Sequence, residues 1–257
     1  MKQEEHVSVR YRSDRGPFDI IGDVHGCLSE LKTLLGALGY SLDPLSHPDG
    51  RKPVFLGDLV DRGPDSPGVV RLVMDAVSQG RAYCVLGNHD EKFRRWLGGR
   101  EVTTGGGLNF TIEQMESESE AFHDTARAFI GTLPLHLVLD EGRLVVAHAG
   151  LHAKWHGRPE SPGARAFALF GETTGQKDEW GFPERLDWAR DYSGEALVVH
   201  GHVADREVRE RNNVICLDTG CAYGGRLTAM RWPERELVQV EAEKTWYESA
   251  RWKAIYG

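Results

Sequence analysis

The sequence predicts an α/β fold with two stacked sheets, and three observations support this prediction. In residues 18–97, three strand–loop–helix units follow one another, each joining a short apolar run to a segment that is apolar on one face. In the second half, short apolar runs separated by glycine and charged residues indicate a second, largely antiparallel sheet. Asp, Asn or His residues follow the apolar runs in both halves, and α/β sheets bind ligands at the carboxyl ends of their strands.

Composition limits the class of protein. The chain of 257 residues, of which 40% are hydrophobic, is long enough to enclose one large core. No apolar run reaches the length of a membrane span, and the polar start lacks the apolar segment of a secretory signal, so we expect a cytoplasmic protein with no membrane partner. The four cysteines show no Cys-x-x-Cys spacing, which indicates reduced thiols rather than a zinc knuckle or a disulfide framework. The net charge of −8 argues against broad adhesion to nucleic acid but is compatible with a small anionic substrate.

The first half of the chain supplies the predicted strand–loop–helix units. Each strand is a short apolar run that stops near a glycine, and each helix shows apolar residues three and four positions apart. Gly39 is a helix stop, and the second helix opens with Ser66 as its cap and Pro67 in its first turn. We therefore expect strands over residues 18–22, 54–57 and 82–86, helices over 29–38, 66–77 and through 93–97, and a loop over 41–52.

The second half of the chain follows a glycine-rich segment. We expect residues 98–109 to form a mobile loop and residues 110–131 to hold helical segments with an acidic face. A hairpin over 135–147 turns at Glu141-Gly142, and further strands are expected over 196–199, 214–217, 227–231 and 237–240. The predicted organisation is a polar arm over 1–17, a single domain over 18–241 with an insert or cap over 151–195, and an aromatic tail over 242–257.

The polar residues at the strand ends suit a metal centre. Carboxylates, imidazoles and an amide form a donor set that fits Mn, Fe, Zn or Co rather than thiolate-bound metals. Their number fits two cations with Asp58 between them, and two-metal hydrolytic sites clamp the attacking and leaving oxygens of an in-line displacement. The strand-end residues are Asp23, His25, Asp58, Asn88, His89, His148, His202 and Asp218.

The stretch from Val54 to Gly63 combines metal and anion chemistry. Asp58 ends the strand, and Arg62 offers a planar fork of donors that suits a phosphate. Asp61 can orient a neighbouring imidazole. The alternative interpretation is an ordinary acidic turn with a surface ion pair.

Five motifs occur in a fixed order along the chain, namely Asp23-x-His25-Gly, Gly57-Asp58-x-Val-Asp61-Arg62-Gly, Gly87-Asn88-His89-Asp, His148-Ala-Gly and Gly201-His202. Together they resemble the signature of the calcineurin-like metallophosphoesterases. The segments 18–27, 61–68, 170–175 and 217–221 further resemble the bacterial branch that contains PrpE-type diadenosine tetraphosphate hydrolases and the phosphatase domain of polynucleotide kinase-phosphatase. The resemblance runs from Phe18 to Val240 and implies an αββα sandwich, in which helices flank two mixed sheets.

The resemblance also implies an activity. A member of this family hydrolyses phosphate esters or anhydrides with two divalent ions, of which Mn is expected here and Ni, Fe, Zn or Co are alternatives. The expected substrate is a small phosphorylated molecule, a nucleotide or a dinucleoside polyphosphate such as diadenosine tetraphosphate, with broad phosphomonoesterase activity. The alternatives are a phosphoprotein, for a serine/threonine/tyrosine phosphatase, or a nucleic acid end, for a polynucleotide 3′-phosphatase or 2′,3′-cyclic phosphodiesterase of RNA repair. A non-catalytic binding module is disfavoured, because the full set of ligands and the acid are present.

Individual roles follow from the same resemblance. One metal would be held by Asp23, His25 and His202, and the other by Asn88 and His148, with Asp58 as the bridge. Arg62 would bind phosphate oxygens. His89, oriented by Asp61, would protonate the leaving oxygen, as suits a group that titrates near neutral pH. Asp218 matches a functional aspartate of the polynucleotide branch and is a candidate for substrate binding.

Further residues have two interpretations each. Lys92 could touch distal phosphates or belong to a solvated basic face, and His200 could be an extra donor or a packing residue. The tryptophans of the insert could sandwich an adenine, and the aromatic tail could stack on bases or, more simply, pack against the core. These aromatic residues are Trp155, Trp180 and Trp188 in the insert, and Trp246, Tyr247, Trp252 and Tyr256 in the tail.

Overall fold

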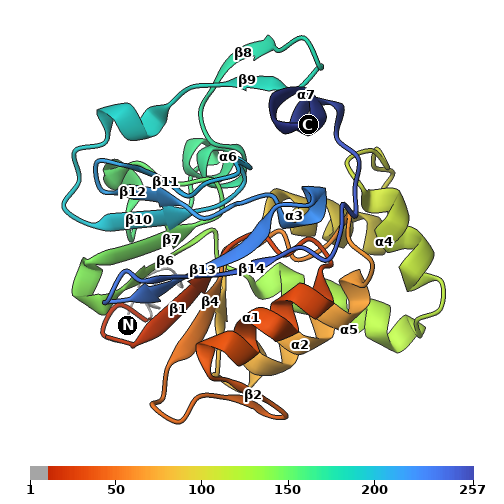
Figure 1. Cartoon of the computed structure of the whole chain (residues 1–257), viewed down its shortest axis with the longest axis horizontal. Coiled ribbons are helices and arrows are strands. Elements are labelled where there is room, and N and C mark those ends of the chain that lie inside the picture. Colours follow the sequence, from red (N-terminus) through yellow and green to blue (C-terminus); the bar gives the residue numbers. More distant parts are fainter. Residues whose placement is uncertain (1–10) are drawn as a thin grey trace, which may run out of the picture.

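The computed structural model describes residues 11–257 and shows two five-stranded sheets stacked face to face, with helices on the outside (Figure 1). The predicted α/β sandwich of two mixed sheets is therefore confirmed. The first ten residues of the predicted polar arm lie outside the described part of the chain. The division into arm, domain and tail stays a prediction.

The first sheet contains the three predicted amino-terminal strands and two strands from the end of the chain. Its parallel strands lie side by side, and the two late strands continue the sheet in antiparallel pairing from β1 outward. Strands 227–231 and 237–240, which we expected in the second sheet, thus complete the first. The order is β14 (Leu237–Glu241), β13 (Arg226–Trp232), β1 (Phe18–Ile21), β4 (Lys52–Phe55) and β5 (Tyr83–Cys84).

The second sheet is mixed, so the expectation of a largely antiparallel sheet is wrong. Strands β7, β10 and β12 are parallel because long connections separate them in the sequence, and only the two edge strands run antiparallel. Each of these central strands is buried along its whole length, as is typical of parallel strands that are covered on both faces. The order is β11 (Arg209–Arg211), β12 (Val214–Cys216), β10 (Leu197–His200), β7 (Leu144–Ala147) and β6 (His136–Leu139).

Helices cover the outer faces of the sandwich. Those of the first half, with α1 and α2 in front in Figure 1, cover the first sheet, and the predicted stop Gly39 adopts a left-handed conformation at the end of α1. The cap of α2 is Asp65 and not the predicted Ser66, because the Asp65 side chain accepts a hydrogen bond from the Gly68 amide at 2.8 Å. The helices are α1 (Leu28–Leu38), α2 (Ser66–Ser78), α3 (Asn88–Leu97), α4 (Leu108–Met115), α5 (Glu120–Thr132), α6 (Pro162–Phe170) and α7 (Ala250–Tyr256).

Two small hairpins lie in segments for which the sequence predicted no strands. The expected loop over 41–52 contains β2 (Ser41–Leu42) and β3 (Leu45–Ser46). The insert over 151–195 contains helix α6 and a hairpin of β8 (Thr173–Lys177) and β9 (Pro183–Arg185). This hairpin projects from the sandwich near α7 (Figure 1). None of the described helices is both long and apolar enough to cross a membrane.

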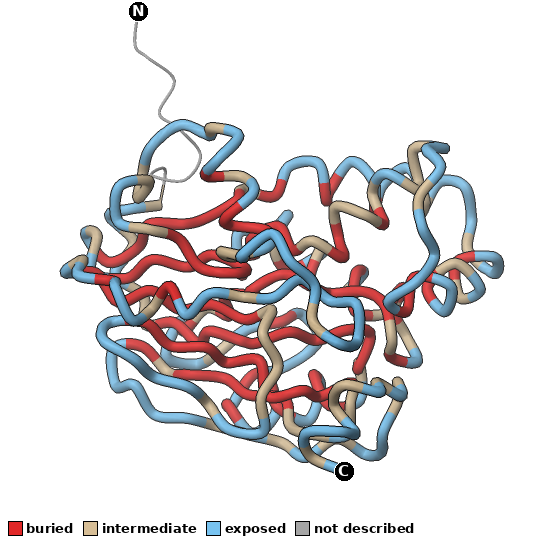
Figure 2. Tube along the Cα trace, turned by 90° about the horizontal axis from the view of Figure 1, so that it is seen from above, coloured by how far each residue is buried: buried red, intermediate tan, exposed pale blue. Residues whose placement is uncertain are grey.

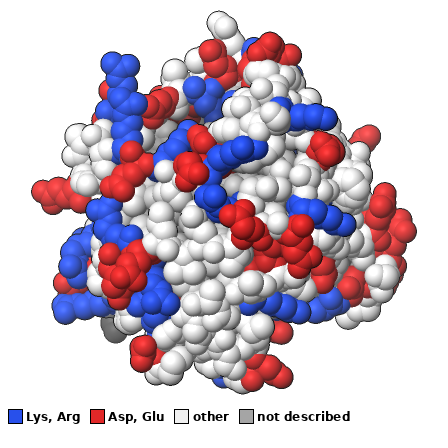
Figure 3. Space-filling model, viewed as in Figure 1, with Lys and Arg blue, Asp and Glu red and all other residues white. Residues whose placement is uncertain are grey.

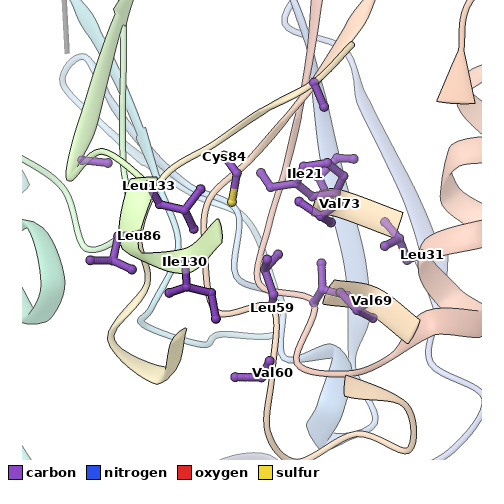
Figure 4. Close-up of a cluster of buried hydrophobic side chains, with 14 of the residues drawn as sticks. Ile21, Leu31, Leu59, Val60, Val69, Val73, Cys84, Leu86, Ile130 and Leu133 are labelled. Atoms are coloured by element: carbon purple, nitrogen blue, oxygen red, sulfur yellow. The ribbon is translucent and has the colours of Figure 1, made fainter. Parts of the chain in front are cut away.

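Two apolar layers hold the sandwich together. Alternate residues of each strand face opposite ways, so Ile20 faces the second sheet while Ile21 faces the helices. The central strands of both sheets are buried, whereas the edge strands β11 and β14 and most of the surrounding loops are exposed (Figure 2). Figure 4 shows the helix-side layer, where Leu31, Val69 and Val73 surround Ile21.

A buried ion pair holds the first sheet together at the end of its strands that lies opposite the loops with the polar motifs. Asp19 of β1 is fully buried, and both of its carboxylate oxygens lie 3.0 Å from Nε of Arg51. The same guanidinium donates to the carbonyl of Phe18 at 2.8 Å and pairs with Glu234 at 3.0 Å. Tyr40 donates its hydroxyl to Asp19 at 2.7 Å. The network joins β1 to the segments before β4 and after β13.

We predict that Arg51→Met lowers the free energy of unfolding by about 3–5 kcal/mol, because the buried Asp19 charge would keep only the Tyr40 hydroxyl and the more distant Arg231, 3.9 Å away, as partners. Chemical denaturation followed by circular dichroism measures the change. Arg226→Met, which removes the two ion pairs that this surface arginine makes with Glu207 and Glu241, is the control and should leave stability nearly unchanged. Equal effects of the two substitutions would contradict the assignment.

Candidate active site

The parallel strands of both sheets end at the same side of the sandwich, and their loops bring the predicted residues together. Asp58 follows β4, Asn88 opens α3 after β5, and His148 follows β7. Nε2 of His148 lies 2.9 Å from Oδ1 of Asn88, 3.3 Å from Oδ1 of Asp58 and 3.0 Å from Nδ1 of His202. Loops from four strands thus meet within hydrogen-bonding distances, as the sequence predicted.

A second group of donors lies on the other side of Asp58. Nε2 of His25 is 3.5 Å from Oδ2 of Asp58 and 4.0 Å from Oδ2 of Asp23. Asp58 therefore presents one oxygen to His25 and the other to His148, as a bridging ligand requires. His202 differs from its predicted grouping, because its ring lies with His148 whereas only its backbone amide contacts Asp23, at 2.9 Å.

The orientation of the imidazoles leaves lone pairs facing one another. Nδ1 of His25 donates to the Val60 carbonyl at 2.8 Å, and Nδ1 of His148 donates to the Leu56 carbonyl at 2.9 Å. In the neutral rings, each Nε2 is then an acceptor: that of His148 points toward the oxygens of Asn88 and Asp58, whereas that of His25 faces Asp58 and also accepts from Arg62. A bound cation relieves this crowding of acceptors, so the arrangement fits a metal centre.

Buried polar atoms without partners give a second test of this fit. Among residues 11–257, Oδ1 of Asp23 and Nε2 of His202 are buried and make no hydrogen bond. Burial, together with Asp218 and Asp58 nearby, raises the pKa of Asp23, and burial next to Asp90 raises the pKa of Asp58. Burial lowers the pKa of His148 to about 3. Carboxylates that are costly to ionise beside neutral imidazoles suit divalent cations, which neutralise the charge.

The backbone of these loops adopts an uncommon conformation. His25, Asp58, Asp61, Arg62 and His202 all have positive φ angles, between 47° and 76°. Such non-glycine conformations are costly and concentrate at functional sites. Glycine at position 57 allows the loop after β4 to approach the loop after β5 closely, because a Cβ on Gly57 would lie 2.5 Å from the amide nitrogen of Gly87. The two loops can meet only because both positions are glycine.

Arg62 and His89 form the anion-binding side of the site. Arg62 donates to Nε2 of His25 at 2.5 Å and to Nε2 of His89 at 2.9 Å, and its own Nε is buried without a partner. Its guanidinium lies 5.0 Å from the ring centre of Tyr223. The half-buried guanidinium of Arg62 is thus held between the two imidazoles and faces the proposed metal ligands.

His89 is oriented as predicted. Its Nδ1 donates to Oδ2 of Asp61 at 2.6 Å, and Thr111 donates to the other oxygen of Asp61 at 2.8 Å. Burial and the charge of Arg62 lower the pKa of His89, while Asp61 opposes this change. Thr111 was missed from the sequence, although it is a polar residue on the buried face of α4 with Leu108 and Met115.

The glycine-rich loop contacts the site in this structure. The Gly107 carbonyl lies 3.4 Å from the Arg62 amide nitrogen, and a Cβ on Gly106 would lie 3.5 Å from the His89 ring. Lys92 donates to the Gly105 carbonyl at 2.6 Å, so it ties this loop to α3. The predicted contact between Lys92 and substrate stays a prediction.

Asp218 lies behind the ligand group. It is buried, its Oδ1 accepts the Gly220 amide at 3.1 Å, and its charge raises the pKa of Asp23. Its contact with substrate also stays a prediction. Burial lowers the pKa of His200 to about 4, and the ring packs 5.6 Å from the Trp188 ring, which favours the packing interpretation.

Most of the aromatic residues considered above for stacking on a base pack against other parts of the protein. Trp155 and Trp188 pack against Phe167, whereas Trp180 is exposed. In the tail, Trp246 donates to Glu30 of α1 at 2.6 Å, and Trp252 stacks on Tyr223 with ring centres 5.3 Å apart. The tail therefore packs against the body of the protein. The four cysteines are buried and free, as expected.

Comparisons with known proteins agree with this geometry. The family model for calcineurin-like phosphoesterases matches residues 16–206. Proteins named bis(5′-nucleosyl)-tetraphosphatase PrpE (asymmetrical) are 43% identical in Anoxybacillus flavithermus, over 87% of this chain and 93% of that protein, and 44% identical in Geobacillus sp., over 86% and 93%.

Solved structures show the same fold. A crystal structure of a candidate diadenosine tetraphosphatase superposes with a TM-score of 0.65 at 30% identity, covering 91% of this chain and 98% of that one. A protein serine/threonine phosphatase from Saccharomyces cerevisiae, at 16% identity and a TM-score of 0.59, shares the fold alone. The motif loops, the sandwich and the family match lead to one conclusion: this chain belongs to the calcineurin-like phosphoesterase family.

Proposed function

We propose that this enzyme hydrolyses dinucleoside polyphosphates, with diadenosine tetraphosphate as the reference substrate, by means of two divalent cations. The observation that carries the proposal is the position of Asp58, whose two oxygens face separate groups of imidazole ligands. The unpartnered atoms of Asp23 and His202 supply one further donor to each group. Mn is the ion expected from the family resemblance, and the donor set also suits Fe, Zn or Co.

The residues divide into two sets of ligands. Asp23, His25 and Asp58 would hold one cation, and Asp58, Asn88, His148 and His202 the other, with His202 assigned by the position of its ring. When bound, such cations stabilise charge on phosphoryl oxygens and make water acidic near neutral pH. The protein contributes fixed loops and oriented imidazoles, so little reorganisation is needed.

The remaining residues act on the phosphoryl group and the leaving oxygen. Arg62 would bind equatorial phosphoryl oxygens, exchanging its hydrogen bonds with the imidazoles for charge-assisted bonds to the anion. Release of Nε2 of His89 from Arg62 would let that nitrogen carry a proton to the leaving oxygen. Asp61 favours the protonated ring, and Thr111 holds the Asp61 carboxylate in place.

The choice of substrate rests on the relatives. Proteins of 43–44% identity across most of the chain are named asymmetrical bis(5′-nucleosyl)-tetraphosphatases. Positive and negative side chains are interspersed on the face shown in Figure 3, which is unlike the continuous basic surface that a polynucleotide favours. Phosphoprotein or nucleic acid substrates are therefore second choices. The cytoplasmic location stays a prediction.

The proposal is tested with protein that carries Mn and a panel of diadenosine tetraphosphate, phosphopeptide and 3′-phosphorylated oligonucleotide. We expect diadenosine tetraphosphate to be cleaved to AMP and ATP with the highest kcat/KM, measured by chromatography of the nucleotides. Symmetrical cleavage to ADP would contradict the asymmetrical assignment. A higher kcat/KM for the peptide or oligonucleotide would overturn the substrate class.

Metal binding is predicted to stabilise the fold through Asp58. Adding Mn²⁺ to metal-free protein should raise the Tm, because the ion binds the folded state and relieves repulsion among buried acceptors. Asp58→Asn should raise the Tm of the metal-free protein, since one buried charge is removed, and should abolish most of the Mn-dependent increase. Differential scanning calorimetry measures both, and a full Mn response in the variant would be inconsistent with a bridging carboxylate.

The effect of removing His89, the proposed general acid, is predicted to depend on the leaving group of the substrate. His89→Ala should lower kcat for phenyl phosphate by about 100-fold or more, because its leaving oxygen needs a proton. The loss for p-nitrophenyl phosphate should be much smaller, since that leaving group departs as an anion. Steady-state kinetics measure both. Equal losses with the two esters would assign His89 a role other than protonation.

A further inference from the structure

A cavity of about 510 Å³ lies beside the ligand group, on the outer face of the second sheet. Its walls are the ends of β10 and β12, the edge strand β11, and the segment that follows β9. Ligand sites occupy roughly 300–1,000 Å³, so this cavity, here called the β11 pocket, has the volume of a small-molecule site. None of the proposed metal ligands lines it.

Two residues that line the β11 pocket are sequence neighbours of proposed metal ligands. Ala149 directly follows the ligand His148, and Val203 directly follows His202, and both line the pocket. A molecule bound at the cations could therefore extend into the pocket across these two loops.

The chemistry of the pocket is that of a nucleoside site. Val203 and Val208 offer partly exposed apolar side chains, and the mostly buried Trp188 and Val214 complete the apolar lining. Such a lining suits a base, because aromatic and apolar side chains contact the faces of nucleobases. At the rim, Asp187 pairs with Arg211, and Glu210 pairs with Arg235 at 2.5 Å. These pairs make the rim polar but nearly neutral, so it suits a sugar and base rather than a further phosphate.

Arg185 lies at the wall of the pocket, near the loop that carries His148. It lines the pocket and donates to the Phe170 carbonyl, and a Cβ on Gly171 would lie 3.7 Å from its Nη1 and 3.6 Å from the Ala149 carbonyl oxygen. Gly171 therefore lies beside both Arg185 and Ala149, the residue after the proposed ligand His148. Among residues 11–257, no carboxylate forms an ion pair with Arg185. An unneutralised cation at this place suits a chain of phosphates that leads from the metal centre to the pocket.

We propose that the β11 pocket binds one nucleoside of a dinucleoside polyphosphate while the phosphate chain passes Arg185 to the metal centre. This inference rests on the proposed function and adds a specificity site to it. It explains how a centre that acts on a phosphoryl group common to many molecules can select one that carries a nucleoside several phosphates away. Binding at such a distance lowers KM for the long substrate without changing the reacting atoms.

The test fills the pocket. Val208→Trp should lower the ratio of kcat/KM for diadenosine tetraphosphate to kcat/KM for p-nitrophenyl phosphate by at least about tenfold, mainly through KM. Glu207→Trp, which adds the same ring to an exposed neighbour outside the pocket, should leave the ratio as in the natural protein. Inorganic tripolyphosphate serves as a third substrate and should behave like p-nitrophenyl phosphate, since it carries no nucleoside.

Three results would overturn the inference: an unchanged ratio in Val208→Trp, an equal fall in Glu207→Trp, or an equal loss with tripolyphosphate. If Val208→Trp does not fold, Ala189→Phe fills the pocket from another wall and decides the matter in the same way. Cleavage of neither diadenosine tetraphosphate nor p-nitrophenyl phosphate by the natural protein would instead contradict the proposed function.

Discussion

The structure depends on one carboxylate shared between two groups of ligands. Asp58 can present an oxygen to each group only because its backbone is held in a left-handed conformation. The loops that hold it there approach more closely than side chains would allow, with glycine at 57 and 87. The cost of this conformation is met by the packed sheets beneath, which fix where each loop begins.

The sandwich makes this arrangement possible. Each sheet contains three adjacent parallel strands, and the two sets end on the same side, so ligands come from both halves of the chain. Neither sheet alone could surround a pair of cations. The apolar layer between the sheets, which includes Ile20 and Val146, therefore determines the distance between the two halves of the site.

Local patterns predicted most elements, and the ordered motifs named the residues that the structure brings together at the strand ends, because apolar runs and motifs are local signals. Pairing across the chain was harder: β13 and β14 have the alternation of a strand, yet nothing in that pattern says which sheet they join. The grouping of His202 failed for the same reason, since motif order does not give the direction of a ring. Thr111 and Arg185 stand in segments without a recognisable motif, and only the fold brings Thr111 to Asp61 and Arg185 to the β11 pocket.

The contact between the tail and Arg62 has a practical consequence. Trp252 stacks on Tyr223, whose ring faces the Arg62 guanidinium, and Trp246 is anchored to α1. The last residues of the chain are thus part of the wall that supports the phosphate-binding arginine. An affinity tag or fusion partner attached after Gly257 would lie next to these contacts and disturb them. A purification tag for kinetic work therefore belongs at the amino terminus.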